Sequence, residues 1–157
     1  MSDDASLELV LKVIDGPGLL VELINRSPDV QGYCFDTFWQ PCILSLKDKS
    51  GKAVEYDDRR TIMKPTMPIG SSAFGSLGPG GGEELQSSQF VRFGKFGYDL
   101  AWDYCKFSNI PPGVYLAVVT MDCQRDSWAD EERKWHTENG VWKGILTSNE
   151  AKIKLPR

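Results

Sequence analysis

Alternating apolar and polar positions begin near the amino terminus. Apolar residues occupy every second position from Leu7 to Val13 and again from Leu19 to Leu23, and Asp15-Gly16-Pro17-Gly18 separates the two runs. A period of two is that of a β-strand with one buried face, and Gly and Pro between two such runs mark a turn. The pattern predicts that the chain opens with a β-hairpin.

The carboxyl half contains two further strand patterns. Val114 to Met121 is apolar at both parities, which is typical of a central strand covered on both sides. Residues 151–155 alternate three apolar side chains with Lys152 and Lys154. Outward-facing lysines suit an edge strand, because charge discourages pairing with another chain.

The middle of the chain is less regular. Shorter strands are indicated at Tyr33 to Trp39, Ile43 to Leu46 and Glu84 to Phe93, whereas residues 59–82 are rich in Pro, Gly and Ser and predict a long irregular connection. The apolar residues from Tyr98 to Phe107 fit a helical turn as well as a strand, so both structures stay open there.

Many short strands without a long helical period predict an all-β fold. We expect an immunoglobulin-like antiparallel β-sandwich of seven to nine strands with long loops. A chain of 157 residues has enough apolar material for one core, so we expect one domain over residues 1–157 with its core from about residue 7 to residue 155.

Charge and hydropathy exclude two classes of partner. The 18 basic and 22 acidic residues are interspersed and give a net charge of -4, so the sequence predicts no nucleic-acid binding. The longest apolar runs are of strand length, so we expect no membrane association. The acidic start, Met1 to Asp4, lacks the features of a signal peptide and predicts a cytoplasmic protein, or an exported one if a leader was removed.

The chain has four cysteines, Cys34, Cys42, Cys105 and Cys123. In the cytoplasm they are expected to be reduced and buried as small apolar residues, and two disulfides are the alternative outside the cell. No close C-x-x-C pair supports a structural zinc site. We therefore expect neither a metal nor a cofactor.

No familiar catalytic motif is found. His136 is the single histidine and has no nucleophile motif beside it, and Asp57-Asp58 precede two arginines as in a solvated turn. The glycines of 78–82 are followed by Glu83-Glu84 rather than by the lysine of a phosphate-binding loop, and the acidic residues of 126–132 lack calcium-loop spacing. The sequence predicts a protein that is not an enzyme.

Aromatic residues in polar segments are the candidate binding residues. Trp128, Arg133 and Trp135 fall within the polar stretch 124–139, and Phe38 with Trp39 forms a second aromatic loop. Tryptophan and arginine are favoured as interface anchors. The two loops would form one binding surface if they lie at the same end of the sandwich.

Two structural questions about the polar stretch stay open. The tryptophans, with Trp142, could instead fold back and cap the sandwich, which is the alternative to a role in binding. A short helix across Asp130 to Trp135 and a loop fit the local sequence equally well.

Several segments resemble a known module. They are Val21 to Ser27, Gly51 to Tyr56, Ser72 to Phe74, Leu77 to Gly80, Tyr98 to Leu100, Pro112 to Tyr115 and Trp142 to Ile153. In these segments the chain resembles the immunoglobulin-like noncatalytic domain associated with deuterolysin-type metalloproteases, and it is similar to bacterial intracellular proteinase inhibitors. The His-Glu-x-x-His zinc motif of the proteases is missing, so the resemblance implies only the noncatalytic module. Inhibitors of chagasin type are also similar, but their Asn-Pro-Thr-Thr-Gly loop is missing.

These observations lead to an expected function. We expect a noncatalytic protein-binding module, an inhibitor or immunity-like partner of an enzyme such as a protease or a toxin. The alternative is a structural or carbohydrate-associated accessory domain whose tryptophans stack on sugar rings. An enzyme with an unfamiliar site is a third possibility.

Overall fold

The fold is all-β. The computed structural model describes residues 6–36, 40–58, 69–92, 97–103 and 105–157. The strands are β1 (Leu7–Ile14), β2 (Gly18–Asn25), β3 (Gln31–Cys34), β4 (Ile43–Asp48), β5 (Asp57–Asp58), β6 (Phe74–Leu77), β7 (Gly82–Gln89), β8 (Val91–Arg92), β9 (Tyr98–Trp102), β10 (Cys105–Ile110), β11 (Gly113–Cys123), β12 (Ser127–Ala129), β13 (Trp135–Thr137), β14 (Gly144–Thr147) and β15 (Ala151–Leu155). A short 3₁₀ helix, η2 (Ser71–Ala73), precedes β6.

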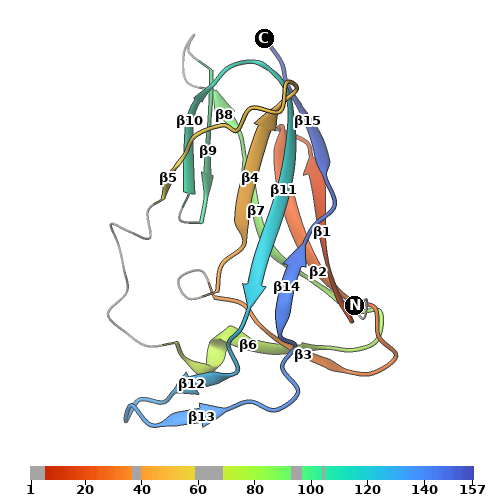
Figure 1. Cartoon of the computed structure of the whole chain (residues 1–157), viewed down its shortest axis with the longest axis vertical. Helices are drawn as coiled ribbons and strands as arrows, with labels where there is room; N and C mark the ends of the chain where they lie inside the picture. The colour runs from red at the N-terminus through yellow and green to blue at the C-terminus, as the bar shows by residue number, and fades with distance from the viewer. Residues whose placement is uncertain (1–5, 37–39, 59–68, 93–96, 104) are drawn as a thin grey trace.

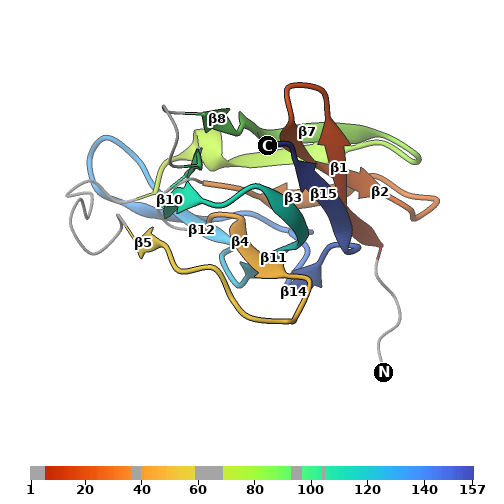
Figure 2. The same cartoon turned by 90° about the horizontal axis from the view of Figure 1, so that it is seen from above.

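The main strands form two facing layers, as in a β-sandwich. One layer contains the antiparallel sheet β1-β2-β7, and the other contains β11, which pairs with β4 along one edge and with β14 and β15 along the other. Figures 1 and 2 show β4, β11 and β14 on the opposite side of the molecule from β2 and β7. A third sheet, β5-β10-β9-β8, lies next to β7, where Ser88 Oγ donates to the carbonyl of Ala101.

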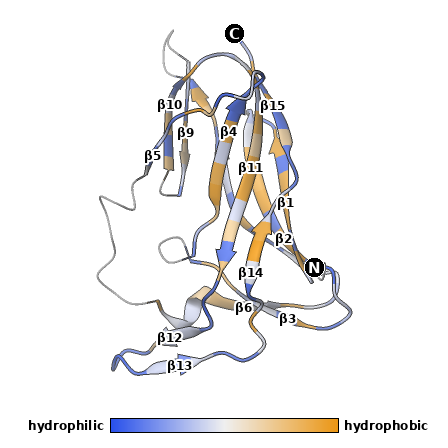
Figure 3. Cartoon of the chain, in the orientation of Figure 1, coloured by the Kyte–Doolittle hydropathy of each residue, from blue (hydrophilic) through white to orange (hydrophobic). Residues whose placement is uncertain are grey.

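The predicted amino-terminal hairpin is confirmed. β1 and β2 pair in register from Leu7 opposite Asn25 to Ile14 opposite Gly18. The alternating leucines and Val21 point into the core, where they are at most 2% exposed, whereas Val13 at the end of the first run is 47% exposed. Figure 3 shows hydrophobic segments alternating with hydrophilic ones along the strands of the sandwich, whereas the tip between β12 and β13 is coloured as hydrophilic.

The prediction of a central strand in the carboxyl half is also confirmed. Ala117, Val119 and Met121 of β11 are fully buried, whereas the apolar residues of the other parity are half-buried. β15 pairs only with β11 within the described ranges, and Lys152 and Lys154 are exposed, as predicted for an edge strand. None of the described residues belongs to a helix with the length and apolar character needed to span a bilayer.

Several segments that the sequence analysis treated as irregular are short strands. Residues 98–102 and 105–107 belong to the paired strands β9 and β10, so the strand alternative is correct there. Residues 124–139 contain the β12–β13 hairpin, and residues 130–134 form the turn between its strands, so a loop rather than a helix is correct for most of 130–135. The solvated turn predicted at Asp57-Asp58 is strand β5, paired with β10. Of the connection predicted at 59–82, residues 69–82 contain η2 and β6, and 59–68 lie outside the described residues. These strands have two to six residues, too few for a period to stand out.

The four cysteines are free thiols, and each is buried. Burial raises the pKa of Cys34 and of Cys123 to about 12, and it raises the pKa of Cys42 further. All three thiols are therefore protonated at neutral pH, a form that is neither nucleophilic nor suited to binding a metal. Cys34 belongs to a small second core with Ile69 and Ala73, separate from the main core of the sandwich.

The fully buried side chain of Asn25 closes the end of β2. Its Nδ2 donates to the carbonyls of Asp29 (2.7 Å), Leu77 (2.9 Å) and Gly78 (3.1 Å), and its Oδ1 accepts from the backbone and the hydroxyl of Ser27. The backbone of Asn25 bonds to Gly80 and Gly81 in the turn before β7. One amide therefore satisfies the polar groups of three segments.

Replacing Asn25 with alanine should destabilise the fold by about 2–4 kcal/mol, because it leaves these buried backbone groups without partners. Equilibrium urea unfolding measures the loss. The exposed Asn139 provides a matched control, and Asn139→Ala should change the free energy of unfolding by less than about 0.5 kcal/mol. Equal stabilities of the two variants would contradict this account of Asn25.

Candidate functional site

The β12–β13 hairpin contains three of the predicted binding residues. It projects from the end of the sandwich opposite the carboxyl terminus (Figure 1). Ser127, Trp128 and Ala129 lie opposite Thr137, His136 and Trp135, respectively. The backbone N–H of Ala129 donates to Ile69 at 2.9 Å, which attaches the hairpin to the small core.

The tip of the hairpin is organised by Asp130. Its backbone N–H donates to the carbonyl of Lys134, and its carbonyl accepts from Arg133, each at 2.9 Å. Its Oδ1 accepts the backbone N–H groups of Glu132 and Lys134. This turn places Arg133 in the left-handed region, with a φ of 64°, and leaves its side chain exposed.

An aromatic stack lies on one face of the hairpin. The rings of Trp128 and His136 are 4.5 Å apart between centroids and inclined by 23°. Trp128 Nε1 donates to Glu138 Oε1 at 2.9 Å, and His136 Nε2 lies 2.8 Å from Asp130 Oδ2. His136 is thus found at the surface, where its ring and one nitrogen stabilise the hairpin.

The tryptophans of this region differ in their exposure. Trp128 is half-buried and packs against the small core, and Trp142 packs against the main core, so the capping alternative is correct for these two. Trp135 is 58% exposed. Neighbouring strand residues point to opposite faces, so Trp135 lies on the face away from the Trp128–His136 stack.

The predicted residues Phe38 and Trp39 lie outside the described residues, but the segments on either side of them are placed. Asp36 and Gln40 pair through both backbone groups. Gln40 is buried; its Nε2 donates to the carbonyl of Cys34, and its Oε1 accepts the N–H groups of Gln124 and Arg125. The base of this loop is therefore bonded to the segment that leads into β12.

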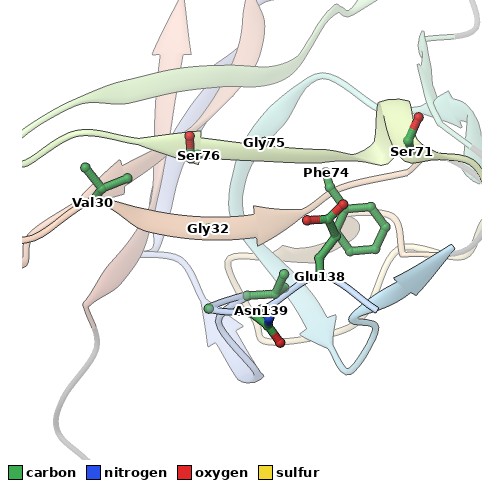
Figure 4. A pocket seen from close by; sticks show the side chains of 10 residues that line it. Val30, Gly32, Ser71, Phe74, Gly75, Ser76, Glu138 and Asn139 are labelled. Atoms are coloured by element: carbon green, nitrogen blue, oxygen red, sulfur yellow. The ribbon is translucent and has the colours of Figure 1, made fainter. Parts of the chain in front are cut away.

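A cleft of about 410 Å³ lies beside the hairpin. Its walls are β3, the η2–β6 segment and residues 138–141 (Figure 4). Glu138 extends from the last of these segments toward the ring of Phe74 in the same view. The sequence analysis identified none of these residues, because no local motif links positions that pair across the fold.

The acid with the most perturbed environment lies elsewhere. Burial, followed by the nearby charge of Asp36, raises the pKa of Asp103 to about 6. Its Oδ2 is buried and has no hydrogen-bond partner within the described part of the chain. In those same ranges, no group of three or more potential ligands is arranged to hold a metal ion.

No protein-family model matches the sequence, and no curated protein matches it. The resemblance to protease-associated and inhibitor domains therefore stays a prediction.

The carboxyl of Asp130 should titrate below its ordinary pKa of 3.8. The hydrogen bond from His136 is the main cause of the lowered pKa, followed by the N–H of Lys134. A pKa that is lower in the folded state stabilises the hairpin above the ordinary carboxyl range, and this contribution is lost as the pH falls through the lowered value. We expect the amide NMR signals of Glu132 and Lys134 to shift with a midpoint below pH 3.8.

Asp130→Asn should abolish this step. The amides of Ser50 and Lys52, which bond to Asp48 in a similar turn, provide an internal control and should titrate unchanged in the variant. A midpoint at or above pH 3.8, or a step that persists in Asp130→Asn, would show that Asp130 does not organise the tip.

Proposed function

We propose that this chain is an immunoglobulin-like, noncatalytic protein-binding module that acts as an inhibitor or immunity-like partner of an enzyme, such as a protease or a toxin. The observation that carries the proposal is the exposed indole of Trp135 on a hairpin whose conformation is held by its own contacts. Solvent exposure of so large an apolar side chain is typical of an interface anchor.

The energetics of Trp135 favour binding over a purely structural role. Most of its ring is in contact with water, so it contributes little to the core. Covering the exposed part of one indole with a partner contributes about 2–3 kcal/mol at 25 cal/mol per Å². One such residue supplies a substantial part of the binding energy of a typical interface.

The surroundings of Trp135 resemble the anatomy of a protein interface. Glu131, Glu132, Arg133 and Lys134 are exposed at the tip and carry both signs of charge. Charged side chains around an apolar centre form the polar rim of many interfaces.

Preorganisation adds to the case. The Asp130 turn, the Trp128–His136 stack and the bond to Glu138 hold the hairpin before any partner arrives. A loop that is already ordered loses little conformational entropy on binding. The same contacts support a noncatalytic role, because His136 stacks on Trp128 and bonds to Asp130 and so stabilises the hairpin.

Trp135→Ala should abolish capture of the partner from a lysate of the source cells by the immobilised chain. Loss of the indole removes the apolar anchor, and affinity should fall at least tenfold, which corresponds to 1.4 kcal/mol. Ile145→Ala is the matched control, because Ile145 is 66% exposed and lies on β14. Far-ultraviolet circular dichroism verifies that both variants fold.

Capture that depends on Trp135 but not on Ile145 supports the proposal. If capture persists in Trp135→Ala, the interface does not lie on the hairpin. If no protein is captured, the proposal fails, and Trp135-dependent binding to an oligosaccharide array would support the carbohydrate-associated alternative.

A further inference from the structure

We infer that the cleft beside the hairpin binds a cationic side chain, lysine or arginine, that belongs to the protein partner. The inference rests on the proposed function and specifies the chemistry that the partner presents. Three features support it: the charge of the cleft, the second carboxylate oxygen of Glu138 and the apolar residues that line the cleft.

The cleft carries one sign of charge. Figure 4 shows the 10 residues that line it, and Glu138 is the only charged residue among them. Among the residues that the structure describes, no lysine or arginine lines the cleft to neutralise this carboxylate. A group that enters the cleft therefore meets an unbalanced negative charge, which favours a cation and disfavours an acid.

The carboxylate of Glu138 is held in place through one of its two oxygens. Its Oε1 is held by Trp128 Nε1 at 2.9 Å. Its Oε2 makes no hydrogen bond or ion pair with any other residue that the structure describes. A carboxylate held through one oxygen offers the second to a guanidinium or an ammonium, in a charge-assisted hydrogen bond.

The apolar lining suits the rest of a long cationic side chain. Phe74 lines the cleft together with Glu138, and Val30, which is 67% exposed, lies at the far end of the cleft (Figure 4). The aliphatic stems of lysine and arginine pack on apolar surfaces while the charged head stays with polar groups. A cation over the face of Phe74 also gains from the ring quadrupole.

The cleft exists before a ligand binds. The backbone N–H of Trp142 donates to the carbonyl of Gly32 at 2.9 Å, and Gln31 Nε2 donates to the carbonyl of Gly140 at 2.8 Å. These bonds join two walls of the cleft. A Cβ at residue 32 would come within 3.0 Å of the Gly140 carbonyl, so glycine at this position permits the close approach.

NMR titration with Nα-acetyl-arginine amide tests the inference without a partner. We expect saturable shifts of the Trp128 indole N–H and of the Gly75 and Gly140 amides. Nα-acetyl-citrulline amide has nearly the same shape without the charge, and it should bind at least about tenfold more weakly.

Glu138→Gln should weaken binding of the arginine probe about tenfold, because it removes the charge and keeps a carbonyl that can accept from Trp128. Glu131→Gln is the control; it removes an equal charge from the exposed tip, outside the cleft, and should leave the affinity unchanged within twofold. Phe74→Leu retains the charge and should weaken binding by a smaller factor. The position of the Trp128 indole signal reports whether each variant keeps the hairpin.

Equal binding of the citrulline probe, equal effects of Glu138→Gln and Glu131→Gln, or shifts confined to other surfaces would each overturn the inference. Its failure can be distinguished from failure of the proposed function. Trp135→Ala should abolish partner capture but leave binding of the arginine probe unchanged. If partner capture is insensitive to Glu138→Gln, the proposed function still holds, but the cationic contact in the cleft does not.

Discussion

The buried side-chain amide of Gln40 joins the segments on which the candidate site depends. Its Nε2 donates to the carbonyl of Cys34 at the end of β3, and its Oε1 accepts the backbone N–H groups of Gln124 and Arg125 between β11 and β12. Each buried polar group left without a partner costs about 1–3 kcal/mol. Both aromatic loops that the sequence analysis singled out therefore start from the same anchored point.

Polar side chains form hydrogen bonds at other strand ends as well. Asn25 satisfies three carbonyls beyond β2, and Asn149 bonds to both backbone groups of Leu11 on β1. Asp130 and Glu138 do the same for the hairpin. Side-chain amides and carboxylates thus supplement strand pairing, and they help the two-stranded projection to keep one conformation. Its exposed indole and the adjoining cleft are consequences of that rigidity.

The main strands could be predicted because one physical signal specifies each of them. Alternation of period two identified β1, β2 and β15, and a doubly apolar run identified β11. By contrast, β6, β12 and β13 have three or four residues; β6 pairs with the distant strand β3, and Ala129 of β12 bonds to the distant Ile69. Local sequence contains no trace of such a partner.

The candidate site could be predicted only in part, for the same reason. Tryptophan and arginine within a polar stretch indicated Trp135 and Arg133, and the structure places both on one exposed hairpin. Trp128 was selected by the same rule, but it packs against the small core. Gln40 and Glu138 gave no signal, because a single glutamine or glutamate acquires its role only when folding brings distant backbone or ring groups to it.

The central claim is that the hairpin is ordered before binding and presents Trp135 to a partner. Amide hydrogen exchange of the free chain, and of the chain bound to its captured partner, tests it most directly. We expect slow exchange at Asp130, Arg133 and Glu138 in the free chain, since these N–H groups are hydrogen-bonded, and added protection at Trp135 and Thr137 in the complex. Exchange of the free hairpin at the rate of an unstructured peptide, or protection in the complex that leaves 127–142 unchanged, would contradict it.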